Sequence, residues 1–225
     1  MKLQPQTLSV LKSFAAINNG IWIKASNVLT TTNHDKTILA TATIPDTFPS
    51  EFGIYDLNQL LSVLSLHKED VVINFDEQHV LIGGKSGRSQ IKYRFTDKRM
   101  LTVPPDKEIK LPSVEIEFVL EEEDYNWVMN AAKVLQSPDI AVRSNGGKMS
   151  LVAYNMKDDS TSTESLEIGD GNGDTFNMIF HTDVLSKIIP DTYNVKISSS
   201  ALVYLENEKG NINYIIALDE KSSYN

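Results

Sequence analysis

Apolar and polar positions along the chain follow two periods in turn, one typical of helices and one typical of strands. Leu8, Leu11 and Phe14 lie on one face of a helix that begins near Pro5, where proline is tolerated. Asp56 stands where a second helix needs an acceptor for its first free amides. The pattern predicts four helices, each followed by three strands, and one further strand leads into each of the last three helices. The predicted helices cover residues 5–17, 56–66, 121–136 and 182–189, and the predicted strands cover residues 20–24, 27–32, 37–44, 52–55, 71–75, 79–84, 89–95, 114–120, 140–144, 148–155, 164–168, 175–180, 193–198, 201–206 and 212–218.

This recurrence indicates one supersecondary unit that is used four times. Residues 96–112 contain three prolines and alternating charges, which suits neither period and favours a linker. Tight turns between the strands favour antiparallel pairing. We therefore predict an α+β fold with two similar domains, residues 1–105 and 106–225, each with two helices against antiparallel sheets.

Charge and composition narrow the class of protein. The chain of 225 residues has no cysteine, which excludes a disulfide framework, a thiolate nucleophile and a cysteine-based zinc site. Residues 1–105 carry 11 basic and 9 acidic side chains, a net +2, whereas residues 106–225 carry 10 and 21, a net −11. This balance argues against a sequence-specific nucleic-acid reader with a wholly basic surface, but it allows one basic face. We expect a soluble intracellular protein, because no signal-peptide core or membrane-spanning run is present.

Two glycine-rich stretches resemble ligand loops, but neither fits. Residues 83–86, Gly-Gly-Lys-Ser, lack the earlier glycine of a phosphate-binding loop because His79 stands there, and a hairpin turn is predicted instead. In residues 170–174, side chains with oxygen ligands alternate with glycines, as at the start of a calcium loop. However, Thr175 and His181 occupy the positions where such a loop has glycine and glutamate. A solvated hairpin tip is predicted there. The four histidines are dispersed, and no catalytic constellation is found.

Lysines are the one charged feature that the predicted helices share. Lys12, Lys133 and Lys187 lie within the first, third and fourth helices, and Lys68 closes the second. Each is compatible with an ordinary solvated lysine. Together they are also compatible with phosphate contacts along one surface, which would give weak, salt-dependent and sequence-independent DNA binding.

Three segments carry a resemblance to a known family. Residues 1–21 have the pattern M-K-L-x-x-x-T-x-x-V-L-K-x-F-A-x-I-N-x-G-I, residues 55–66 have Y-D-L-N-x-x-L-x-x-L-S-L, and residues 190–193 have P-x-x-Y. These motifs resemble the sliding clamps of T-even-type bacteriophages, the processivity factors of replicative polymerases. Lys12 stands at the family's lysine, and Lys133 and Lys187 at positions that are basic in the family. The second helix departs from the pattern, because only His67 and Lys68 at its end are basic.

The resemblance implies a non-enzymatic homotrimeric ring that encircles duplex DNA, with helices lining the hole and sheets outside. Twelve helices spaced ~10 Å apart would leave a bore of ~28 Å, wide enough for a duplex ~20 Å across, whereas eight would leave ~15 Å. The implied partners are DNA, the DNA polymerase, an ATP-dependent clamp loader and late-transcription factors. No cofactor is implied. The implied location is the cytoplasm of the infected bacterial host.

Apolar residues in the proline-rich segment suggest a docking groove for partner peptides, to which Leu101, Val103, Ile109 and Leu111 would contribute. They are equally compatible with pinning the linker to the core. The alternative function is a metal-dependent hydrolase or nuclease that uses acidic residues of 157–175. That function requires carboxylates that converge on one pocket.

Overall fold

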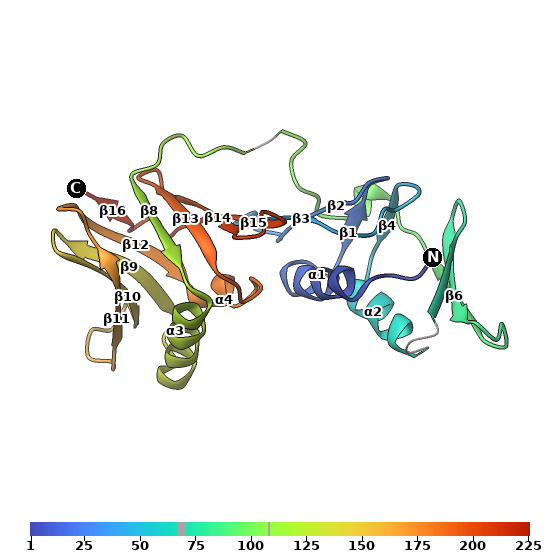
Figure 1. Ribbon diagram of the computed structural model, residues 1–225, viewed down its shortest axis with the longest axis horizontal. Coiled ribbons are helices and arrows are strands. Elements are labelled where there is room, and N and C mark those ends of the chain that lie inside the picture. Colours follow the sequence, from blue (N-terminus) through green and yellow to red (C-terminus); the bar gives the residue numbers. More distant parts are fainter. Residues whose placement is uncertain (67–70, 108) are drawn as a thin grey trace. The chain divides into compact units, whose positions relative to one another are not determined.

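The computed structural model describes residues 1–66, 71–107 and 109–225. The chain divides into two compact units, Met1–Asp106 and Lys107–Asn225 (Figure 1). Both units combine helices with antiparallel strands, so the predicted α+β class is confirmed. Within the described residues, no helix combines the length and the apolar character that crossing a membrane requires.

The helices and strands of the first unit fall close to their predicted bounds. Its elements are α1 (Pro5–Ile17), β1 (Ile21–Ile23), β2 (Val28–Thr32), β3 (Ile38–Thr43), β4 (Phe52–Ile54), α2 (Leu57–Ser65), β5 (Val71–Phe75), β6 (His79–Gly84), β7 (Gln90–Arg94) and the 3-10 helix η2 (Lys98–Met100).

A buried carboxylate fixes the start of α1. Gln4, the residue before the helix, offers no side-chain cap, and Pro5 occupies the first turn. Asp46, which is 9% exposed, supplies the missing acceptor, since its Oδ2 accepts from the Gln4 amide at 2.8 Å and from the Thr7 hydroxyl at 2.6 Å. The buried face of α1, which includes Leu11 and Phe14, then packs on the core of the unit.

The second helix begins as predicted. The Asp56 side chain accepts a hydrogen bond from the Gln59 amide at 2.8 Å, so its N-cap role is confirmed. Leu57, Leu60 and Leu64 form the buried face of α2. The two helices lie side by side (Figure 1).

Strand pairing in the first unit links one repeat to the other. Strand β4, which leads into α2, pairs with β1, which follows α1. The residues that lead into α1 pair in turn with β5, which follows α2. The Met1 ammonium donates to the Ile73 carbonyl at 2.7 Å, and the Ile73 amide donates to the Met1 carbonyl at 2.9 Å. The remaining pairings are the β2–β3 hairpin and the sheet β5-β6-β7.

The second unit repeats this exchange with longer strands. Strand β8 leads into α3 but pairs with β13, which follows α4, and β12 leads into α4 but pairs with β9, which follows α3. The resulting sheets have the orders β11-β10-β9-β12-β16 and β15-β14-β13-β8. The elements of the unit are β8 (Ile116–Leu120), α3 (Glu122–Leu135), β9 (Asp139–Asn145), β10 (Lys148–Tyr154), β11 (Glu164–Asp170), β12 (Thr175–His181), α4 (Thr182–Leu185), β13 (Tyr193–Ser198), β14 (Leu202–Asn207), β15 (Ile212–Ala217) and β16 (Ser223–Tyr224).

Two local predictions in the second unit were wrong. Residues 170–174 are not a hairpin tip, because β11 and β12 lie on opposite sides of the β9–β10 pair and the segment crosses between them. It packs against the β9–β10 turn, where the Gly171 amide donates to the Gly147 carbonyl at 2.6 Å. The fourth helix ends at Leu185 rather than at residue 189. Pro190 disfavours helical backbone at the residue before it, which limits the helix from that side.

Tyrosine hydroxyls form hydrogen bonds with backbone groups of residues 185 and 189, at the end of α4 and in the turn that follows it. Tyr125 of α3 donates to the Leu185 carbonyl at 2.8 Å, and Tyr193 donates to the Ile189 carbonyl at 2.5 Å. The Ile189 amide donates to the Tyr214 hydroxyl at 3.1 Å. Burial raises the pKa of the Tyr125 and Tyr193 hydroxyls, so both remain protonated donors. These bonds fix the turn after α4 against α3.

The predicted linker begins as part of the first unit. Thr96 donates its amide to the Gly53 carbonyl at 2.9 Å, and the Thr102 carbonyl accepts from the Asn18 amide group at 3.1 Å. Between these two residues, the Leu101 side chain packs against Gly20. A Cβ atom added at Gly20 would lie only 2.7 Å from the Leu101 Cδ2, so this packing requires glycine there. The first part of residues 96–112 therefore belongs to the packing of Met1–Asp106.

We expect Asp46→Ala to lower the free energy of unfolding by about 1–3 kcal/mol, because the buried Thr7 hydroxyl and the Gln4 amide both lose their acceptor. Urea denaturation followed by circular dichroism measures this loss. Asp46→Asn keeps an acceptor oxygen and should cost less. Asp35→Ala, in an exposed turn, is the matched control and should change stability by no more than about 0.5 kcal/mol. Equal losses at positions 35 and 46 would contradict the capping role.

Candidate nucleic-acid interface

The exposed face of α1 carries one charge. Its outward residues are Gln6, Ser9, Lys12 and Ala16, and the helix contains no acidic residue. Lys12 is exposed, as a phosphate contact requires. The helix thus offers a single positive charge on an otherwise neutral surface, which suits a weak contact.

The exposed face of α2 is neutral. It consists of Asn58, Gln59, Ser62 and Ser65. The predicted contact Lys68, together with His67, lies outside the described residues. The described part of α2 therefore contributes polar but uncharged groups beside α1.

The third helix has an acidic start and a basic end. Glu122, Glu123 and Asp124 occupy its first turn, where they favour the positive end of the helix dipole. Partial burial, and then the charges of Glu121 and Glu123, raise the pKa of the Asp124 carboxyl. Lys133 lies in the last turn and is exposed, as predicted. Only the C-terminal half of α3 therefore suits a phosphate contact.

Lys187 is not where the sequence placed it. It lies in the turn after α4, not within a helix, and it is only partly exposed. Its Nζ is 3.8 Å from the Asp183 carboxylate, so part of its charge is balanced within the unit. The tyrosine bonds to residues 185–189 hold this turn in place. A phosphate contact by Lys187 would thus come from a rigid turn.

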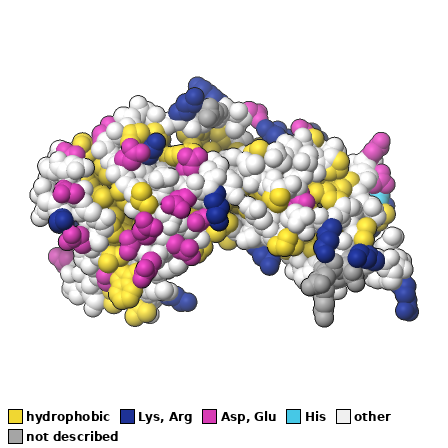
Figure 2. Space-filling view, viewed as in Figure 1, with side chains coloured by type: hydrophobic (Ala, Val, Ile, Leu, Met, Phe, Trp, Pro, Cys, Tyr) yellow, Lys and Arg dark blue, Asp and Glu magenta, His cyan; other side chains and the backbone are white. Residues whose placement is uncertain are grey.

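The two units differ sharply in charge. Unit Met1–Asp106 has 11 basic and 10 acidic residues, a net +1, whereas Lys107–Asn225 has 10 and 20, a net −10. Acidic side chains are spread over the face of the second unit that Figure 2 shows. An anionic polymer would be repelled by that face.

The acidic segment 157–175 does not converge on a site. Asp158 accepts from the Ser160 amide and hydroxyl, Glu167 pairs with Lys148 at 3.3 Å, and the Asp170 side chain accepts from the Asn172 amide. Within the described residues, no three His, Asp or Glu side chains are grouped closely enough to hold a metal ion. Each of these carboxylates has its own local partner.

The predicted hairpin turn after Gly84 is confirmed, since the Gly87 amide donates to the Gly84 carbonyl at 3.0 Å.

The predicted peptide-groove residues are dispersed along the chain segment. Leu101 is committed to the packing around Gly20 and Gly53, Val103 and Leu111 are half-buried, and Ile109 is 38% exposed. The docking role of Val103, Ile109 and Leu111 stays a prediction.

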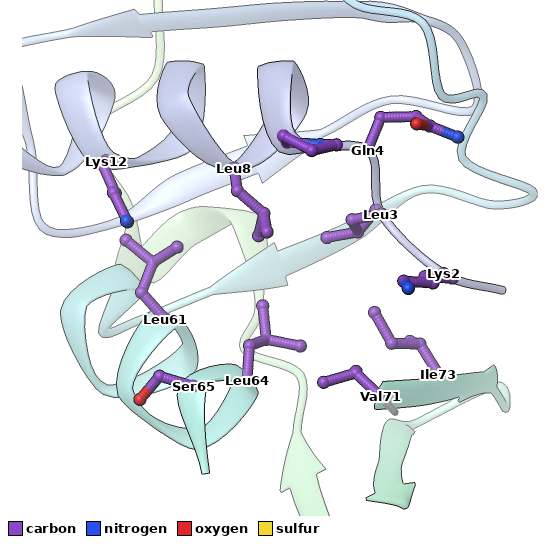
Figure 3. Close-up of a pocket in the computed structure, with 11 residues that line it drawn as sticks. Lys2, Leu3, Gln4, Leu8, Lys12, Leu61, Leu64, Ser65, Val71 and Ile73 are labelled. Atoms are coloured by element: carbon purple, nitrogen blue, oxygen red, sulfur yellow. The ribbon is translucent and has the colours of Figure 1, made fainter. Parts of the chain in front are cut away.

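Sequence reasoning missed a cavity in the first unit. It lies between α1, α2, β5 and the N-terminal residues, and its volume is about 500 Å³ (Figure 3). Its wall is apolar, and Lys2 and Lys12 also line it. Trp127, a 58% exposed residue on α3, is also not among the predicted site residues. The helical period offered a signal, because Tyr125, Val128 and Ala132 form the buried face and leave Trp127 off it.

Comparison with known proteins confirms the resemblance. The family model described as DNA polymerase processivity factor matches residues 2–101. The chain is 32% identical over 208 residues to the sliding clamp of Vibrio phage KVP40, covering 90% of this chain and 92% of that protein. It is 31% identical over 230 residues to the sliding clamp of Enterobacteria phage T4, covering 100% and 99%.

Solved structures agree on the fold. The chain is similar to A. fulgidus PCNA, which was solved with the C-terminal region of FEN-1 bound, with a TM-score of 0.67 at 15% identity over 96% of both chains. The T4 relative matches this chain over its whole length at 31% identity. The chain therefore belongs to the sliding clamps, the DNA polymerase processivity factors of bacteriophages.

Proposed function

We propose that three copies of this chain close head to tail into a ring around duplex DNA and tether the replicative polymerase to it. The single observation that carries the ring is a pair of open sheet edges with opposite charge. Strand β7 ends the sheet β5-β6-β7, and β11 ends the sheet of the second unit, within the described strands. Open edges present unpaired backbone groups that pair readily with another chain.

The side chains on these edges are complementary. Lys92 and Arg94 are exposed on β7, and Lys85 and Arg88 occupy the turn before it. Strand β11 carries Glu164, Glu167 and Asp170. Pairing of β7 with β11 of the next copy would bring opposite charges together, whereas β7 with β7 or β11 with β11 would oppose like charges.

A closed ring needs no tight grip on DNA, since it cannot dissociate sideways. Lys12, Lys133 and Lys187, together with Lys68 at the end of the second helix, would make phosphate contacts that are weak, salt-dependent and independent of sequence. The net −10 of Lys107–Asn225 would repel the duplex from the other surfaces of that unit. Sliding then follows from contacts that are individually easy to exchange.

The proposed partners follow from this role. They are duplex DNA, the DNA polymerase, a separate ATP-dependent loader that opens the ring, and late-transcription factors. The relative from A. fulgidus binds a C-terminal region of FEN-1, and we propose that this chain likewise receives partner peptides, with Val103, Ile109 and Leu111 at the docking groove. The proposed location is the cytoplasm of the infected bacterial host, and no cofactor is required.

Charge reversal on one edge should dissociate the ring. We expect Lys92→Glu with Arg94→Glu to weaken subunit association by at least about tenfold, because like charges would face β11 of the next copy. Light scattering should then give a molar mass near one chain at a concentration where the natural chain gives three. Adding Glu167→Lys and Asp170→Lys should restore the larger mass. Lys24→Glu, on an exposed loop, is the control. A mass of three chains for the β7 variant would refute edge pairing.

Charge reversal on the helices should weaken retention on DNA but not folding. We expect Lys12→Glu and Lys133→Glu each to lower the amount of clamp retained on nicked circular DNA after loading, and to steepen the loss with salt because both side chains are exposed and would repel phosphates. Urea denaturation should give an unchanged free energy of unfolding. The control is Lys221→Glu, an exposed lysine outside the helices. Natural retention by both helix variants would remove these residues from the DNA-facing surface.

A further inference from the structure

An exposed tryptophan stands out on α3. Trp127 is 58% exposed and Val134, two turns later on the same face, is 80% exposed. A large aromatic ring in water is uncommon on a surface without a partner, and tryptophan is enriched where proteins associate. The indole is also held in place, because its Nε1 donates to the Glu164 carboxylate at 3.1 Å. Trp127 is therefore a pre-oriented aromatic anchor.

Glu164 connects this anchor to the sheet edge. It is the first residue of β11, so Trp127 lies beside the start of the acidic edge strand. The second carboxylate oxygen of Glu164 is buried and has no hydrogen-bond partner within the described residues. A buried acceptor without a donor is unusual in a finished interface. Within the described residues, the indole ring of Trp127 is thus largely uncovered, and the second carboxylate oxygen of Glu164 lacks a hydrogen-bond donor.

The first unit carries a cavity of matching character. The side chains of Leu3, Leu8, Leu61, Leu64, Val71 and Ile73 form its wall, and Figure 3 shows Leu8, Leu61 and Leu64 converging on one space between α1 and α2. Its volume of about 500 Å³ falls in the range of pockets that hold molecules larger than an indole. The cavity can therefore accept a tryptophan side chain.

Charges around the anchor and the cavity are opposite. Glu123 lies one helical turn before Trp127 on the same face, with Glu122 beside it. Lys2 and Lys12 line the cavity. Insertion of Trp127 would bring these carboxylates toward the Lys2 ammonium group, which favours this pairing over docking of two identical surfaces.

We propose that Trp127 of one copy enters the α1–α2 cavity of the next copy and anchors the subunit contact. This inference rests on the proposed ring and adds a side-chain anchor to the pairing of β7 with β11. With β11 paired outside β7, three strand spacings, about 14 Å, separate it from β5, which backs the cavity, and the α3 residues that pack beside β11 must span this distance. Each copy would contribute one anchor and one cavity, as a head-to-tail contact requires.

Engineered cysteines test the contact directly, since the chain has no native cysteine. Asn130→Cys, one turn after Trp127 on the exposed side of α3, is combined with Ser65→Cys, which lines the cavity. Mild oxidation should give covalently linked multimers up to three chains on a non-reducing gel. Asn130→Cys with Tyr55→Cys is the matched control, because Tyr55 is 62% exposed but does not line the cavity, and it should stay unlinked. Linking in the control alone would overturn the proposal.

Tryptophan fluorescence supplies a second readout. The chain has two tryptophans, so Trp22→Phe leaves Trp127 as the only emitter. The Trp127 emission should shift to shorter wavelength as the protein concentration is raised and the molar mass increases from one chain to three. Trp127→Ala and Leu61→Glu should each raise the dissociation constant of the ring at least tenfold, while circular dichroism stays unchanged. Tyr55→Ala should leave assembly unaffected.

The outcomes separate the two proposals. If Trp127→Ala forms a normal ring, or if Trp127 emission is the same in monomer and ring, the anchor is wrong and the ring stands. If the natural chain keeps the mass of one chain at every concentration, both the ring and the anchor are wrong. If Trp127→Ala dissociates a ring that the β7 charge variant leaves intact, the anchor stands and edge pairing fails.

Discussion

The exchange of leading strands is the constraint on which the rest of the structure depends. In the second unit, the strand before each helix completes the sheet that follows the other helix, β8 with β13 and β12 with β9. Neither repeat can satisfy its backbone hydrogen bonds alone, because each would leave a strand without its partner. The two repeats must therefore fold together, and the helices are brought to adjacent positions. The first unit keeps the same arrangement in reduced form through β4 with β1 and Met1 with Ile73.

This constraint also determines the surface that the helices present. Each helix uses one face for the core, and the outward faces of α1 and α2 are small, polar or neutral apart from Lys12. The turn after α4, which carries Lys187, is held by three tyrosine hydroxyls. Rigid helices with sparse positive charge suit transient phosphate contacts, whereas catalysis requires groups that converge on one pocket.

Local sequence patterns predict most helices and strands, but they do not predict which strands pair with one another. Periodicity and the cap at Asp56 located the helices and strands almost to the residue, because those signals are short-range. The partner of each strand is a long-range choice, so short-range signals predict a hairpin tip at residues 170–174, where the chain crosses between β11 and β12. The early end of α4 depends on tyrosines 60 residues before and 25 residues after the groups they bind. The lysines are visible on the predicted helices, and the family resemblance supports their role, whereas the helical period leaves Trp127 off the buried face without indicating a use for it.

The same exchange of strands also decides which sheet edges stay open. The sheet β5-β6-β7 and the sheet β11-β10-β9-β12-β16 each have one edge strand paired within the unit, since Met1 bonds to β5 and the two-residue strand β16 pairs with β12. The opposite edges, β7 and β11, are open within the described strands and differ in charge. Exposed edges normally invite uncontrolled pairing. Here, a basic edge on one unit and an acidic edge on the other disfavour pairing of identical edges, so the proposed association would run from the first unit of one copy to the second unit of another. A contact of that kind is not self-complementary, and it ends only when a ring closes.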